Sequence, residues 1–154
     1  MLLPTGPTMF AALRPDPWDG PLFMHVGGAM LMMGGLLGAA LVLITGRERW
    51  VQATGFRILL LVALPGFILM RAGAEWIRSR EHWGDSTPTW MGIGYLTSDI
   101  GFLLMLVALI LGGVWARRKA RGGGERLSRA AGIICGVLMV AYVVTIWAMS
   151  AKPS

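Results

Sequence analysis

Four long apolar stretches, separated by short polar ones, dominate the pattern along this 154-residue chain. They cover approximately residues 21–45, 53–74, 89–116 and 130–150. A hydrocarbon core about 30 Å thick needs roughly 20 helical residues to cross it, so each stretch is long enough. In lipid, backbone N–H and C=O groups must be bonded inside each segment, which favours helices. The pattern predicts an all-α membrane protein, an up-and-down four-helix transmembrane bundle with short loops.

The second stretch is the least regular of the four. Its charge-free part, residues 58–70, is too short to span alone. Arg57 and Arg71 are therefore expected near the two interfaces, with side chains that reach outwards to water. Pro65 should kink the helix because it lacks a backbone N–H. A re-entrant segment is the alternative.

The two ends of the chain lie outside this pattern. Residues 1–20 contain four prolines and are expected to form an irregular N-terminal tail, with residues 152–154 as a short C-terminal one. No basic residue precedes the apolar part of the N-terminal tail, which argues against a cleavable signal peptide. The first apolar stretch is then the insertion signal.

Charge is sparse and lies between the apolar stretches. Charged residues make up 14% of the chain, against about a quarter in soluble domains, and the net charge is +6. Nine Lys and Arg lie in the linkers 46–52 and 117–129 or at Arg57, and five lie on the other side. This bias predicts cytoplasmic linkers and both termini outside. No recognition motif accompanies the charge, so nucleic acid is not expected as a partner.

Small residues at a spacing of four let membrane helices approach closely. The first stretch has Gly34–Gly38 and Gly35–Ala39, and the fourth has Gly132–Gly136. We expect these faces to pack against each other within the bundle, and a homodimer interface is the competing interpretation. Apart from the lipid bilayer, the partners open to this chain are thus another membrane protein or a second copy of itself.

Polar residues gather at the predicted outer end. At a rise of about 1.5 Å per residue, His25, Arg71, Glu75 and Asp99 come out at similar depth. Arg71 and Glu75 are four residues apart and can pair on one helix face, and Arg71 and Asp99 form the natural bridge between helices. Ionisable groups at membrane depth often mark a site. Two interpretations stay open. These residues form ion pairs that hold the helix ends together, or they form a ligand-binding site. The less polar neighbours at this end are Thr97, Ser98, Tyr142 and Thr145.

Metal chemistry depends on a single histidine, because His25 is the only one in a predicted span. Imidazole can bind haem iron or copper, and thioethers suit Cu(I). A haem b held by two histidines would need His82 from a loop. Four methionines fall towards the same end, namely Met24, Met70, Met91 and Met149, and Met32 lies seven residues from His25 on roughly the same helix face. Methionines in apolar chains also serve simply as packing residues. The single cysteine, Cys135, excludes an intrachain disulfide and a cysteine-based zinc cluster.

Two short motifs carry a family resemblance. They are residues 23–29 (FMHVGGA), followed by Gly34-Gly35, and residues 147–153 (WAMSAKP). From about residue 21 to its end, the chain resembles small, mostly uncharacterised bacterial integral membrane proteins that are distantly related to the copper-resistance D family. The resemblance implies four or more membrane helices, a bacterial inner membrane and a link to copper handling. Only His25 carries over, as a candidate metal ligand.

No catalytic motif is present. The chain has no Ser/His/Asp set, acidic metal motif or Gly-rich nucleotide loop, so an enzyme is not expected. We expect a non-enzymatic accessory protein or a small-ligand binder with a polar site at its outer end. A small transporter or a component that handles copper or haem is the alternative. An open outer pocket lined by the candidate residues would favour ligand binding over an accessory role.

Overall fold

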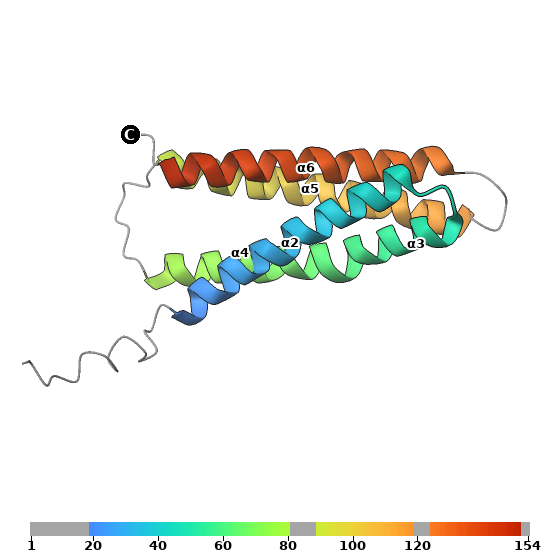
Figure 1. Ribbon diagram of the computed structural model, residues 1–154. Coiled ribbons are helices and arrows are strands. Elements are labelled where there is room, and N and C mark those ends of the chain that lie inside the picture. Colours follow the sequence, from blue (N-terminus) through green and yellow to red (C-terminus); the bar gives the residue numbers. More distant parts are fainter. Residues whose placement is uncertain (1–18, 81–88, 119–123, 152–154) are drawn as a thin grey trace, which may run out of the picture.

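Four long apolar helices pack as an antiparallel bundle, and each is long enough to span a membrane (Figure 1). The computed structural model describes residues 19–80, 89–118 and 124–151. The elements are α2 (Asp19–Thr45), α3 (Arg49–Ile58), the π-helical turn η1 (Leu59–Ala63), α4 (Leu64–Arg80), α5 (Thr89–Arg118) and α6 (Glu125–Ala151). The predicted fold class is confirmed. The N-terminal tail up to residue 18 and the C-terminal residues 152–154 lie outside the described residues.

The second span is one unbroken helix of 32 residues, made of α3, η1 and α4 in succession. The re-entrant alternative is therefore wrong. The disturbance expected at Pro65 takes the form of η1, the π turn before it. There the Leu64 N–H bonds to the Leu59 carbonyl, one residue further back than in an α-helix. The wider turn lets the helix pass a residue that cannot donate a hydrogen bond.

The helices run past the predicted spans because hydropathy marks the edge of the membrane and not the end of a helix. The second span begins at Arg49 and ends at Arg80, beyond both limits of the predicted range 53–74. The connection to α2 is correspondingly short. It is held by the buried amide of Gln52, which donates to the Gly46 carbonyl at 2.9 Å.

The loop predicted at residues 117–129 is also shorter than expected, since α5 continues to Arg118 and α6 begins at Glu125. Gly124, directly before α6, has φ +104°, a left-handed conformation that favours glycine. Its carbonyl accepts a hydrogen bond from the Leu127 N–H at 2.8 Å. Gly124 is thus the residue directly before α6 whose carbonyl accepts a hydrogen bond from the first turn of the helix.

Buried positions recur at seven-residue intervals in all four spans. A repeat of 3.5 residues per turn keeps one seam of each helix facing its neighbours, as in left-handed coiled coils. Many of these positions hold small residues, which suits helices that must touch closely in lipid. The series are Gly28–Gly35 and Met32–Ala39 in α2; Leu59–Gly66–Gly73 and Ala63–Met70 in the second span; Met91–Ser98–Met105–Gly112 and Gly101–Ala108–Trp115 in α5; and Ser128–Cys135–Tyr142 and Ala131–Leu138–Thr145 in α6.

The closest helix contact is between α2 and the second span, along η1 and α4. A Cβ added at Gly35 would lie 2.7 Å from the backbone nitrogen of Ala63, and one at Gly66 would lie 2.5 Å from that of Met32. At Gly73 the added Cβ would meet the backbone nitrogen of His25 at 2.4 Å. The two backbones are in direct contact, with no room for any side chain at these positions.

This contact corrects the predicted packing glycines. A Cβ at Gly34 or at Gly136 would meet nothing within 4 Å among the described residues, so neither glycine lies in a close helix contact. A Cβ at Gly38 would be only in ordinary contact with Ile58, at 3.6 Å. Gly132 does face α2, where an added Cβ would lie 2.9 Å from Leu43. The four-residue spacing fits both Gly34–Gly38 and Gly35–Ala39, and the structure buries Gly35 and Ala39 in place of Gly34 and Gly38.

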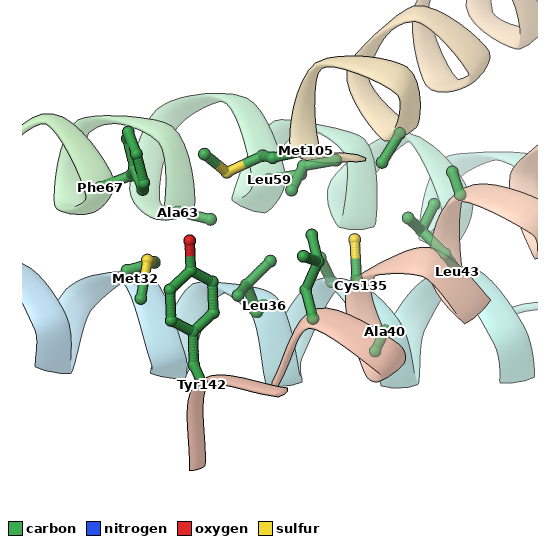
Figure 2. Packing of buried hydrophobic residues seen from close by; sticks show 14 of the residues in the cluster. Met32, Leu36, Ala40, Leu43, Leu59, Ala63, Phe67, Met105, Cys135 and Tyr142 are labelled. Atoms are coloured by element: carbon green, nitrogen blue, oxygen red, sulfur yellow. The ribbon is translucent and has the colours of Figure 1, made fainter. Parts of the chain in front are cut away.

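The bundle consists of two helix pairs. α2 packs most extensively on α4, α5 packs on α6, and the pairs are joined mainly along α2 and α6 (Figure 1). α4 and α5 touch at few positions, one of which is the stacked pair Phe67–Phe102, with ring centroids 5.1 Å apart. Between the pairs lies an apolar core that includes Met32, Leu36 and Tyr142 (Figure 2). The side between α4 and α5 is therefore the least closed.

Two neighbouring glycines test the α2–α4 contact. Gly35→Ala should lower the free energy of unfolding by about 1–3 kcal/mol, because the helices must move apart to admit the methyl group. Gly34→Ala, in open space, should leave stability unchanged or slightly higher. Thermal unfolding of both variants in one detergent would measure the difference. Equal losses at the two positions would contradict the assigned face.

Candidate functional site

A cavity of about 120 Å³ lies at one end of the bundle. This end, called here the Arg71 end, is where α2 and α5 begin and where α4 and α6 end. All four spans contribute to the wall, which is mostly apolar. Its polar members are His25, Arg71, Tyr95, Ser98, Tyr142 and Thr145. Two of the four predicted site residues, His25 and Arg71, therefore line a cavity.

Arg71 forms both predicted ion pairs. Its Nε lies 3.2 Å from Glu75 Oε1 on the same helix, and its Nη1 lies 3.1 Å from Asp99 Oδ1 on α5. The guanidinium also sits over the ring of Tyr95, 4.6 Å from the ring centroid, and Arg78 approaches the same ring at 5.2 Å. Arg71 thus ties α4 to α5 across the least closed side of the bundle. His82, the second histidine that a haem b would need, lies outside the described residues.

The charge of Arg71 is already balanced within this network. Two carboxylates, those of Glu75 and Asp99, face one guanidinium. Neither carboxylate residue lines the cavity, and the Asp99 side chain is 66% exposed. The network borders the cavity and leaves no unbalanced positive charge in it to attract an anion.

His25 faces the cavity with one ring nitrogen already used. Nδ1 lies 2.9 Å from the carbonyl oxygen of Met70 on α4. A carbonyl can only accept, so Nδ1 carries the hydrogen and donates it. In the neutral ring, Nε2 is then an acceptor with a free lone pair, and no partner for it is found among the described residues.

Two hydroxyl groups on the cavity wall have no hydrogen-bond partner in the described part of the chain. Ser98 is 6% exposed and Tyr142 is 5% exposed, and both oxygens are unbonded. Tyr142 extends from α6 into the bundle interior (Figure 2). Thr145, also on the wall, differs because it donates to the Ala141 carbonyl of its own helix at 2.9 Å. Buried hydroxyls are rarely left unpaired, so those of Ser98 and Tyr142 need an explanation.

Thioethers form much of the apolar wall. Of the five methionines singled out in the sequence, Met32, Met70, Met91 and Met149 line the cavity, whereas Met24 does not. No group of three or more His, Cys, Asp or Glu side chains that could hold a metal ion occurs among the described residues. A copper ion here would have to rely on His25 and thioethers.

The predicted set of site residues therefore needs revision. Glu75 and Asp99 hold Arg71 instead of facing the cavity, while Ser98, Tyr142 and the thioethers face it. The missing signal was the seven-residue repeat. It places Ser98 seven positions after Met91, and Met149 seven after Tyr142, on the inner faces of α5 and α6.

Comparison of the chain with protein-family models, with curated proteins and with solved structures gives no match. The resemblance to the copper-resistance D family stays a prediction.

The two carboxylates that contact Arg71 should differ in their effect on stability. Asp99→Asn removes a bridge between helices and should cost about 0.2–1 kcal/mol, since both partners are partly exposed. Glu75→Gln makes the same chemical change, a carboxylate to an amide, but removes an ion pair within one helix. It should therefore lower the free energy of unfolding by less than Asp99→Asn does. Unfolding of the two variants at low and high salt would measure this. A larger loss in Glu75→Gln would show that the bridge to α5 has no special role.

Proposed function

We propose that this chain is a non-enzymatic membrane protein that binds a small neutral molecule in the cavity at the Arg71 end. The observation that supports this most directly is the pair of buried, unpartnered hydroxyls of Ser98 and Tyr142 on the cavity wall. A buried polar group without a partner costs about 1–3 kcal/mol. A ligand that bonds to these hydroxyls would recover that loss.

Neutrality follows from the surrounding charges. Arg71 is paired with Glu75 and Asp99, so an anion gains little from it. A cation would have to enter an apolar cavity whose nearest carboxylates already face Arg71. An uncharged molecule with an apolar body and one or two polar atoms suits this wall, as in most small-molecule sites.

Copper is the second candidate occupant. Four thioethers and His25 on one wall favour Cu(I), as does the family resemblance. A Cu(I) ion, however, would not bond to the hydroxyls of Ser98 and Tyr142, which would remain unpaired. The neutral molecule accounts for more of the wall than the metal does. A transporter is less favoured, because four helices leave little room for a pore in one protomer.

We further propose that the Arg71 end faces outwards from the inner membrane of a bacterium. Among the described residues, seven arginines lie at the opposite end and three at the Arg71 end. Basic residues beside the spans are retained on the cytoplasmic side. Both termini would then be outside, and the connections within residues 46–52 and 117–129 would be cytoplasmic.

A C-terminal reporter tests this orientation. Alkaline phosphatase folds only outside the cytoplasm, so a fusion after Ser154 should be active, whereas a green fluorescent protein at the same position should be dark. Fusions placed after Arg118 should show the reverse pattern. A fluorescent C-terminal fusion would overturn the assigned orientation.

Methionine methyl groups provide a direct measurement of ligand binding. With [methyl-13C]methionine in lipid nanodiscs, cyclohexanol should shift the resonances of Met32, Met70, Met91 and Met149, which line the cavity. Met30, which is 70% exposed on the lipid side, serves as the control for cyclohexanol dissolved in the bilayer. Equal shifts at Met30 and at the cavity methyls would mean that the cavity does not bind the probe.

A matched pair of alanines on α4 completes this experiment. Ala74 lines the cavity, whereas Ala72, two residues away, is exposed. Ala74→Leu should fill the space and remove the cyclohexanol shifts, while Ala72→Leu should leave them unchanged. Shifts that persist in Ala74→Leu would contradict binding at this site.

A further inference from the structure

The cavity has the size of a single six-membered ring. Its volume is about 120 Å³, and an apolar cavity of about 150 Å³ in another protein accommodates benzene. A long acyl chain or a fused ring system would not fit inside, although a substituent could leave by the sparsely packed side between α4 and α5. A single ring, with or without a tail in the lipid, therefore suits the cavity.

The chemistry of the wall favours an aromatic ring over a saturated one. Thioether sulfurs make favourable contacts with aromatic ring edges, worth about 0.3–1.5 kcal/mol each. Four of them, from Met32, Met70, Met91 and Met149, surround this space.

The polar residues of the wall suit a hydroxyl on that ring. The Nδ1–H of His25 is bonded to the Met70 carbonyl, so in the neutral ring Nε2 is an acceptor that a donor on the ligand can reach. The hydroxyls of Ser98 and Tyr142 can each donate or accept, and they can bond to the ligand oxygens. A phenolic O–H is a stronger donor than an aliphatic alcohol and suits an imidazole acceptor.

We infer that the occupant is a hydroxylated aromatic ring, the chemistry shared by the headgroups of membrane quinols and by free phenols. In the bound state the hydroxyl group on the ring donates a hydrogen bond to His25 Nε2. The hydroxyls of Ser98 and Tyr142 bond to the oxygen atoms attached to the ring, and the thioethers contact the ring itself. This inference rests on the proposed function, that the cavity binds a neutral molecule. It concerns binding alone and requires no electron transfer.

Substitutions that remove single hydroxyl groups separate ligand binding from folding. Ser98→Ala and Tyr142→Phe each remove a hydroxyl that has no protein partner, so neither should lower the melting temperature. Each should weaken phenol binding by about threefold to tenfold, the value of one hydrogen bond. Ser128→Ala is the matched control, because Ser128 also has a buried unpartnered hydroxyl but does not line the cavity. It should leave phenol affinity unchanged.

The ligand series uses the same methionine resonances in nanodiscs. Phenol is compared with anisole, which lacks the donor, and with cyclohexanol, which lacks the aromatic ring. Phenol should bind about tenfold more tightly than either. The difference from anisole corresponds to one hydrogen bond between neutral groups, and the difference from cyclohexanol corresponds to a few ring–sulfur contacts. A decyl-substituted hydroquinone, kept reduced under argon, forms the fourth arm. Tighter binding of the hydroquinone assigns the site to membrane quinols, and tighter binding of phenol assigns it to free phenols.

Two results would overturn the inference. One is that neither phenol nor the hydroquinone binds more tightly than anisole and cyclohexanol. The other is that Ser98→Ala and Tyr142→Phe bind phenol as well as Ser128→Ala does. In either case, cyclohexanol shifts confined to the cavity methyls would leave the proposed function standing. Loss of those shifts as well would remove both.

Discussion

Direct contact between the backbones of α2 and α4 is the constraint on which the rest of this bundle depends. In lipid, apolar side chains gain nothing by leaving their surroundings for a helix interface, so association relies on close packing and polar bonds. Gly28 and Gly35 on α2, and Gly66 and Gly73 on α4, each lie against backbone atoms of the opposite span with no space for a Cβ. The same contact brings the His25 ring within hydrogen-bonding distance of the Met70 carbonyl. Backbone packing thereby sets the position of a histidine ring in the first span.

The cavity is a consequence of how the two helix pairs meet. α2 with α4 and α5 with α6 are each well packed, and the pairs join along α2 and α6. At the Arg71 end, α4 and α5 are linked by side chains instead of backbone contact. Phe67 stacks on Phe102, and Arg71 reaches both Asp99 and Tyr95. Long side chains that bridge a gap leave space beside them, and the thioethers line that space without filling it.

Much of this architecture could be predicted from the sequence, because hydropathy and helix length alone require four spans. The Arg71–Glu75 and Arg71–Asp99 pairs also followed from spacing and depth. The helix faces could not be read from hydrophobicity, since lipid-facing and core-facing positions are equally apolar. A spacing of four fits both Gly34–Gly38 and Gly35–Ala39 and does not tell which pair packs, and Gly34 faces open space. A search for small or weakly polar residues at intervals of seven finds Gly35, Ser98 and Tyr142 together.

The size and occupancy of the site depend on side-chain packing, which the spacing of residues along the sequence does not reveal. Four methionines leave a space where α4 and α5 separate. This space exists only in the assembled bundle, so it could not be predicted from the sequence of any one helix. The role of the carboxylates was misjudged for a similar reason. At equal depth Asp99 and His25 look equivalent, but Asp99 faces Arg71 and the surroundings, whereas His25 faces the interior.

Of the three buried, unpaired hydroxyls among the described residues, two belong to residues that line the cavity at the Arg71 end, which supports the proposal that this end binds a ligand. Polar groups in a membrane interior destabilise a bundle unless they are bonded. Thr145 meets this requirement within its own helix, and Gln52 does so by closing the turn after α2. Ser98 and Tyr142 do neither, although alanine and phenylalanine would pack in nearly the same way. Ion pairing by Arg71 would not need them, whereas a ligand with a hydroxyl group would.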